Sequence, residues 1–285
     1  MLPICGGARL RGLDSRLAPG AHGGFDSSVS EGSGKDSGPF VRVKNLHHSF
    51  GAQRVLRGVN LEVTRGETLA LLGRSGGGKS VLIKHLPGLL RPDEGEVWID
   101  GVEISEMKER ELGSVRRKVG MMFQGGALFD SFTVGENVAF PLREAGVRDE
   151  EEIERRAGEA LEIVGLAGQE DKLPAELSGG MRKRVALARA VVHRPACVLY
   201  DEPHAGLDPV TADSIDTLIR SLRDKYGITN IVVTHEMRSV FRIADRVVFM
   251  KDGQVYWTGT PRQFRDSHDP LLKAFLEGQC ECENV

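Results

Sequence analysis

The sequence predicts an α/β fold with a mostly parallel core sheet, an antiparallel β subdomain and a helical insertion. Three observations lead to this prediction. Short apolar runs such as residues 68–72 and 231–234 alternate with helical segments, which is typical of parallel sheets. Apolar and polar residues alternate strictly over 41–44 and 59–63, which indicates half-buried strands. Residues 133–177 carry helix signals only, so they predict an inserted helical region, whose last helix extends to about residue 193.

The composition is that of an ordinary globular protein large enough to bury a core. The chain has 285 residues, 40% of them hydrophobic and 28% charged. No apolar run approaches the roughly 20 residues that span a bilayer, so we do not expect the chain itself to form a channel or a permease. The formal net charge of −3 gives no basic surface for binding phosphate backbones, so no nucleic-acid partner is expected.

Both ends of the chain read as tails. Gly, Ser and Pro fill 18 of residues 1–39, a composition that predicts a disordered N-terminal tail, although its arginines keep an organelle transit peptide open. Residues 279–285 are expected to form a C-terminal tail. Cys280 and Cys282 lie there without a second ligand pair, so we expect no metal, and the four cysteines fit a reducing cytoplasm.

The expected elements follow from local signals along residues 40–278. A helix is predicted over 79–90, ending near Pro87 and Gly88. Thr133 with Glu136 has capping-box spacing, and Asp149 is expected to begin a second helix. Further strands are expected at 97–99, 119–123, 197–200, 231–234 and 246–250, and a helix is expected to begin at Asp208-Pro209.

One stretch, Gly73-Arg-Ser-Gly-Gly-Gly-Lys79-Ser80, matches G-x-x-x-x-G-K-[ST] between an apolar strand and a helix. Glycines let the backbone approach phosphates closely, and successive N–H groups can bind them. Lys79 is expected at the β- and γ-phosphates and Ser80 at Mg²⁺. The motif predicts a P-loop that binds a nucleotide through Gly73, Arg74, Ser75, Gly76, Gly77, Gly78, Lys79, Ser80 and Val81.

A Mg²⁺-nucleotide site also needs a carboxylate at the end of a neighbouring strand. Asp201 and Glu202 directly follow the apolar run 198–200. Asp201 is expected to hold the metal through water, and Glu202 to act on the attacking water as general base. An Asp-Glu pair after a strand is otherwise commonly a solvated turn, and the P-loop favours the catalytic interpretation.

With these motifs and several others in order, residues 40–278 resemble the ATP-binding subunit of ABC transporters. Leu177-Ser-Gly-Gly-Met181 is similar to the family's signature, and Ala205-Gly-Leu-Asp208 to its D-loop. Gln124 lies at the Q-loop position, His235 at the position of the switch histidine, and Phe50 at that of the aromatic that stacks on adenine.

The resemblance implies an ATPase in which two copies of the chain pair head to tail around two ATP molecules. Ser178, Gly179 and Gly180 begin a helix whose N–H groups form an anion site. The resemblance implies that this site contacts the ATP of the partner subunit. It also implies that Gln124 joins Ser80 and Asp201 at Mg²⁺, and that His235 contacts the γ-phosphate.

Several positions also have simpler interpretations. A strand-end histidine such as His235 is often paired with a neighbouring carboxylate, and a lone aromatic such as Phe50 is usually core. His47 and His48 are expected on the surface. His204 departs from the family pattern, since most relatives carry Thr there, which puts the geometry near the D-loop in doubt.

Within the family, three stretches resemble the Mla group, which powers phospholipid transport with a permease and an MCE-domain protein; a chloroplast relative serves lipid import. They are Met181, where most members have Gln, and the segments 124–143 and 269–278. The resemblance implies a location at the cytoplasmic face of the inner membrane. Residues Ala127, Leu128, Phe129 and Phe132 either form an exposed groove for a permease helix or pack the core of the helical insertion.

Other functions remain open. An importer of amino acids or metal ions is the main alternative, because membrane subunits choose the cargo. A soluble ABC ATPase acting on DNA or ribosomes is disfavoured by the single cassette and the acidic charge. A non-hydrolysing module is disfavoured because Lys79, Asp201, Glu202 and His235 are all present.

Overall fold

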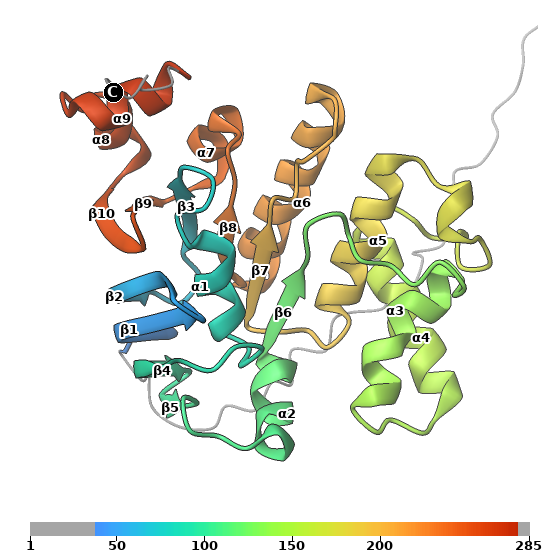
Figure 1. Cartoon of the computed structure of the whole chain (residues 1–285). Coiled ribbons are helices and arrows are strands. Elements are labelled where there is room, and N and C mark those ends of the chain that lie inside the picture. The colour runs from blue at the N-terminus through green and yellow to red at the C-terminus, as the bar shows by residue number, and fades with distance from the viewer. Residues whose placement is uncertain (1–37, 279–285) are drawn as a thin grey trace, which may run out of the picture. The chain divides into compact units, whose positions relative to one another are not determined.

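The candidate site lies at the ends of strands in the central sheet. The structure is a computed structural model that describes residues 38–278, and within them six strands form this sheet in the order β10-β9-β3-β8-β7-β6 (Figure 1). All neighbours pair in parallel except β10 at one edge. The strands are β3 (Thr68–Gly73), β6 (Val119–Met122), β7 (Cys197–Asp201), β8 (Thr229–Val233), β9 (Arg246–Lys251) and β10 (Gln254–Gly259).

A second, antiparallel sheet lies on the other side of helix α1 (Lys79–His85). Its strand order is β2-β1-β4-β5, and both predicted alternating segments belong to it. Leu82 and Ile83 of α1 share one buried cluster with residues of both sheets. The strands are β1 (Val41–Phe50), β2 (Gln53–Val63), β4 (Glu94–Ile99) and β5 (Val102–Glu103). The predicted α/β fold with its antiparallel β region is confirmed.

The helical region contains α3 (Val134–Glu144), α4 (Glu150–Ile163) and α5 (Gly179–Val191), which pack on one another beside β6 and β7 (Figure 1). The expected N-caps are confirmed: Thr133 accepts from the Glu136 N–H, and Asp149 accepts from two N–H groups of the first turn. The core cluster of these helices continues into the sheet through Val198 and Tyr200. The helical region is therefore joined to the strand that ends in Asp201.

One helix prediction needs correction, and one helix was not predicted. The expected helix over 79–90 ends at His85, because Pro87 lacks an N–H group and Gly88 has a positive φ of 66°. Helix α2 (Glu109–Lys118) has no counterpart among the expected elements. The remaining α-helices of the described residues are α6 (Pro209–Tyr226), which Asp208 caps as expected, α7 (Met237–Ile243), α8 (Pro261–Arg265) and α9 (Pro270–Leu276), and a short 3-10 helix spans Pro174–Glu176. The expected tails 1–39 and 279–285 lie outside the described residues except for positions 38 and 39.

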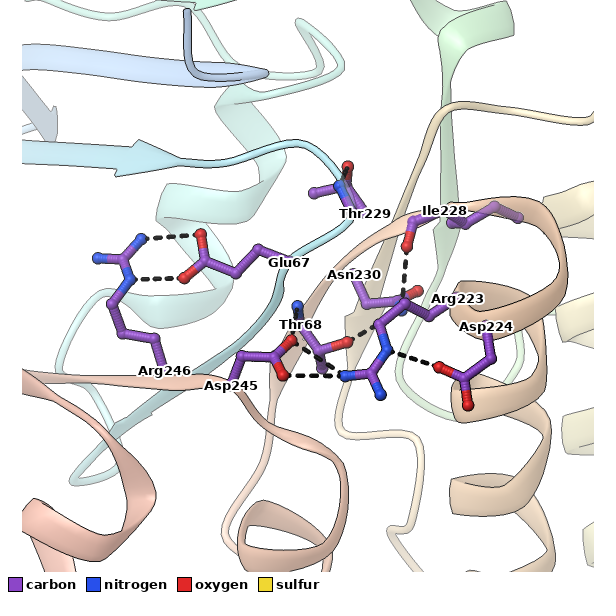
Figure 2. A network of polar contacts seen from close by, with 10 residues as sticks. Glu67, Thr68, Arg223, Asp224, Ile228, Thr229, Asn230, Asp245 and Arg246 are labelled. Atoms are coloured by element: carbon purple, nitrogen blue, oxygen red, sulfur yellow. Dashed lines mark hydrogen bonds and ion pairs between the residues drawn. The ribbon is translucent and has the colours of Figure 1, made fainter. Parts of the chain in front are cut away.

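A polar network joins the starting ends of β3 and β8 (Figure 2). The Thr68 N–H donates to Asp245, which also accepts from Arg223 of α6. Asn230 donates to the hydroxyl of Thr68. Arg246 pairs with Glu67 beside this group. Because the strands are tied together here, their opposite ends, which carry the P-loop and His235, are fixed relative to each other.

Candidate functional site

The P-loop connects β3 to α1, and its lysine is held by the loop itself. Lys79 is buried, and its Nζ donates to the carbonyl oxygens of Gly73 at 2.7 Å and Arg74 at 2.9 Å. Gly73 has a φ of 143°, and a Cβ there would collide with the carbonyl oxygen of Met250. Position 73 therefore requires glycine, because β3 passes close to β9 there. The P-loop also holds the Lys79 ammonium group at its centre.

A cavity of about 540 Å³ lies beside this loop. The P-loop supplies one wall, and the other walls bring together residues that are up to 185 positions apart in the sequence, Phe50 and His235. The predicted residues among its lining are Phe50, Ser75, Gly76, Gly77, Gly78, Lys79, Ser80, Val81, Gln124, Glu202 and His235. Ala205, the first residue of the segment that resembles the D-loop, also lines the cavity. Gln53 and Val55 line it as well and belong to no sequence motif.

Oxygen donors suited to Mg²⁺ meet at the end of β7. Ser80 Oγ donates to Asp201 Oδ1 at 2.8 Å, and Asp201 is buried. Gln124, two residues after the end of β6, lines the cavity together with Ser80. A hydroxyl, a carboxylate and an amide oxygen are the hard donors that Mg²⁺ prefers, so these residues fit the metal that the sequence predicts.

Glu202 and His235 contact each other at the adjacent strand ends: His235 Nε2 lies 3.0 Å from Glu202 Oε1. Burial raises the pKa of Glu202, the Lys79 charge opposes this, and the Asp201 charge adds to it. Burial and then repulsion by Lys79 lower the pKa of His235. The lowered pKa favours a neutral imidazole at neutral pH, and the raised pKa makes the Glu202 carboxylate a better proton acceptor. The pair can therefore orient a water molecule and accept its proton.

The backbone at Glu202 is held in an unusual conformation. Its φ is 50°, the left-handed region that residues other than glycine rarely adopt. The Glu202 N–H donates to the Val233 carbonyl at the end of β8, and its own carbonyl accepts from the Ala205 N–H. Lys183 of α5 lies with its Nζ 3.5 Å from the same carbonyl oxygen. Neighbouring elements thus impose the direction of the Glu202 side chain.

The signature residues begin α5, as expected, but lie away from this cavity. Ser178 is the N-cap and accepts from the Met181 N–H at 3.3 Å. Within the described residues, Ser178, Gly179 and Gly180 are not part of the cavity lining. A Cβ at Gly180 would overlap the methyl group of Thr211 on α6. The N-terminal turn of α5 is therefore packed tightly against the first turn of α6.

Two polar residues that the sequence analysis did not single out, the buried Asn137 and the half-buried Arg189, shape the loop between Gln124 and α3. Asn137 of α3 binds the backbone of Phe129 in both directions and donates to the carbonyl oxygens of Phe132 and Thr133. Arg189 of α5 donates to the carbonyl oxygens of residues 126 and 127. No local pattern distinguishes such anchors, since their partners are backbone groups.

The aromatic at the cavity rim is exposed, and the histidine beside it is buried. Phe50 is 52% exposed, so it is not a core residue. The His48 ring packs against it in a T-shaped arrangement, with the ring centroids 4.7 Å apart. The expectation that His48 lies on the surface is wrong, because the side chain fills the space between β1 and His85 of α1.

We expect Phe50→Ala to weaken ATP binding while leaving the maximal hydrolysis rate nearly unchanged. Base–aromatic stacking contributes about 1–3 kcal/mol, so the KM for ATP should rise by about fivefold or more. Steady-state kinetics of the full chain measure this. Phe50→Trp is the control and should retain the wild-type KM. An unchanged KM in Phe50→Ala would show that the exposed ring does not stack on the base.

Comparison with known proteins agrees with these motifs. A family model described as ABC transporter matches residues 56–205, more than half of the chain. The chain belongs to the ABC transporter family. It is an ABC ATPase, and ABC relatives with different cargo resemble it to a similar degree. It is 43% identical to the methionine import ATP-binding protein MetN of Carboxydothermus hydrogenoformans, over 83% of this chain and 71% of that protein.

Two relatives are named for lipids. The intermembrane phospholipid transport system ATP-binding protein MlaF of Haemophilus influenzae is 40% identical over 85% of this ABC chain and 91% of that protein. The chloroplastic protein TRIGALACTOSYLDIACYLGLYCEROL 3 of Arabidopsis thaliana is 37% identical over 90% of this chain and 81% of that protein. The ABC relatives are thus named for different cargo, although their sequence identities to this chain are similar.

Solved ABC structures support the fold. A dimeric ATP-binding cassette in a post-hydrolysis state, bound to ADP and Pi, matches with a TM-score of 0.72 and 35% identity, over 78% of this chain and 99% of that chain. Within residues 38–278, no helix of the ABC chain combines the length and apolar character that crossing a bilayer requires.

Proposed function

We propose that this ABC ATPase powers the movement of phospholipid, as the ATP-hydrolysing subunit of a transporter at the cytoplasmic face of the inner membrane. The observation that carries the proposal is the similarity to MlaF, which extends over 91% of that protein. Met181 and the segments 124–143 and 269–278, which resemble the Mla group, support it. We assign the ATPase domain to residues 40–278 and its helical insertion to about 133–193.

In the proposed reaction the P-loop and Lys79 bind the phosphates of ATP. Phe50 stacks on adenine, and Ser80, Asp201 and Gln124 supply the oxygens for Mg²⁺. Glu202 accepts the proton of the attacking water, and His235 contacts the γ-phosphate and orients that water. The raised pKa of Glu202 makes it a stronger base than an exposed glutamate. All of these side chains converge on one cavity or its immediate margin.

The proposed reaction needs a second copy of the chain. The signature residues at the start of α5 do not line the cavity of their own chain. In a head-to-tail pair, Ser178, Gly179 and Gly180 would instead present their N–H groups to the γ-phosphate of the partner's ATP. The solved cassette bound to ADP and Pi is dimeric, which supports this arrangement.

An apolar hollow of about 330 Å³ is the proposed contact for the permease. Phe129 is exposed at its rim and packs on the rings of Phe132 and Phe140, with centroids 5.0 and 4.9 Å away. Leu128 turns inward and packs on the core of the helical region. Of the two interpretations of this segment, the groove thus applies to Phe129 and the core to Leu128. Asn137 and Arg189 fix the segment, so the ring is presented on a rigid surface.

We expect Phe129→Asp to release the chain from its permease without affecting ATP binding by the isolated chain. A carboxylate in an apolar contact loses its hydration, which costs several kcal/mol. Recovery of the complex from detergent-solubilised membranes should fall by about tenfold or more. Phe129→Leu is the matched control, since it retains an apolar side chain. Equal recovery of the Phe129→Asp complex would contradict the proposed contact.

Methionine import is the second candidate, because MetN is 43% identical. The test is transport by proteoliposomes that contain the chain and the permease with which it copurifies. ATP-dependent transfer of labelled phospholipid, with an MCE-domain protein in the complex, supports the proposal. ATP-dependent methionine uptake without lipid transfer overturns it in favour of the second candidate.

A further inference from the structure

His204 lies two positions after Glu202 and is buried, yet it does not line the nucleotide cavity. Its Nε2 lies 2.8 Å from Asp216 Oδ1 of α6, a carboxylate whose side chain is only 1% exposed. Its Nδ1 lies 3.4 Å from Thr234 Oγ1. Ser239 Oγ of α7 is 3.4 Å from Nε2. One side chain thus contacts three elements that meet behind the reaction centre.

The contact with Thr234 leads directly to the predicted switch histidine. Thr234 is the residue after β8 and precedes His235, and its Oγ1 also accepts from the Glu236 N–H at 3.0 Å. The Asp216 carboxylate only accepts, so Nε2 of His204 is the donor in that contact. The contact between Nδ1 and Thr234 Oγ1 is the second hydrogen bond of the ring.

The contact with Asp216 holds the His204 side chain against α6. Asp216 lies two turns into α6, and α6 packs against α7. Within the described residues, His204 is the only side chain that lies within hydrogen-bonding distance of the Asp216 carboxylate. A buried carboxylate needs such a donor, so the imidazole cannot move without a large cost. His204 is therefore fixed to α6, and through Thr234 it restricts the backbone that carries His235.

We propose that His204 is a positioning residue for ATP hydrolysis, which sets the separation of Glu202 and His235 by tying the loop after β7 to α6 and to Thr234. The proposal rests on the proposed roles of Glu202 and His235. Glu202 is held at a φ of 50°, a conformation that its surroundings must impose, and His204 is the buried polar anchor of that loop. Hydrolysis depends on a 3.0 Å contact across two strand ends, so small displacements there matter.

Two amide substitutions separate the two contacts of His204. The amide nitrogen of Gln reaches the position of Nε2, so His204→Gln keeps the donor to Asp216 and loses the contact with Thr234. The amide nitrogen of Asn lies near Nδ1, so His204→Asn keeps the Thr234 side and leaves Asp216 without its donor. Thr234→Val removes the hydroxyl from the other partner at nearly constant volume, and Thr234→Ser keeps it.

The experiment measures kcat and KM for ATP and the melting temperature of the full-length chain for each variant. In His204→Gln and Thr234→Val, we expect kcat to fall by roughly tenfold with an unchanged KM. The melting temperature should stay close to that of the wild type in His204→Gln, and Thr234→Ser should retain the wild-type kcat. His204→Asn should melt at a lower temperature, because it leaves a buried carboxylate unpaired.

Wild-type kcat in both His204→Gln and Thr234→Val overturns the proposal. If His204→Gln does not fold, wild-type kcat in Thr234→Val by itself overturns the proposal, because that variant lacks the hydroxyl that contacts His204 as well as the acceptor of the Glu236 N–H. Glu202→Gln is measured in parallel. Retained turnover in Glu202→Gln would refute the proposed base, whereas its loss together with full activity in His204→Gln and Thr234→Val would refute the positioning role alone.

Discussion

Glu202→Gln should abolish turnover and leave ATP binding near its wild-type strength. The substitution keeps the size of the side chain and removes the carboxylate that lies 3.0 Å from His235 Nε2. General-base catalysis contributes about 10²–10⁴-fold, so hydrolysis should fall at least about 100-fold. Phosphate release by the assembled transporter and nucleotide titration of the full chain measure the two quantities. Wild-type hydrolysis after this change would show that Glu202 is not the base.

The same residue predicts a pH dependence. Burial, with the Asp201 charge adding to it, raises the pKa of Glu202. The protonated form is therefore favoured in the folded chain. Protonated Glu202 contributes its full stabilisation at pH values below its pKa in the unfolded chain. This stabilisation is lost as the pH rises through its higher pKa in the folded chain. Glu202→Gln should thus melt at the same or a higher temperature than the wild type at neutral pH, and wild-type hydrolysis should decline on the acid side as Glu202 becomes protonated.

Lys79→Ala should lose ATP binding itself, which distinguishes it from Glu202→Gln. The ammonium is buried at the centre of the P-loop, and burial lowers its pKa while Glu202 and Asp201 oppose that shift. Removing one member of a buried charge contact costs about 2–5 kcal/mol, so the Kd for ATP should rise on the order of 100-fold. Fluorescent-nucleotide titration of the full chain measures this.

Lys84→Ala is the matched control for Lys79→Ala. Lys84 lies in the same helix, α1, but does not line the cavity. Its removal changes the net charge equally, so the affinity for ATP should stay at the wild-type value. If both variants lost affinity equally, net charge rather than the position of Lys79 would explain the effect.

The parts of this fold that sequence predicts best are those with a local cause. Thr133, Asp149 and Asp208 begin helices because each side chain binds N–H groups within three residues, and all three were expected. The parallel sheet follows from apolar runs that alternate with helices. Helix α1 ended early because the turn at Pro87 and Gly88 outweighs the apolar periodicity that continues past it.

The candidate site divides in the same way. The cavity lining contains most of the expected residues, since each belongs to a motif with its own local chemistry. The burial of His48 and the anchoring by Asn137 could not be predicted, because their partners come from distant parts of the chain. The contact of His204 with Asp216 has the same origin: an unusual residue was visible in the sequence, but its partner was not.

The close packing of Gly180 on Thr211 has a consequence for how this chain can vary. Thr211 Oγ1 donates to Asp208 Oδ2 at 2.5 Å, so its methyl group cannot rotate away without losing that bond. Any side chain at position 180 therefore requires a smaller one at position 211. Thr211→Ser should restore the stability that Gly180→Ala loses, because serine keeps the hydroxyl and lacks the methyl carbon that overlaps the new Cβ. The side chains at these two positions, 31 residues apart, therefore limit each other's size, and we expect substitutions at them to occur together.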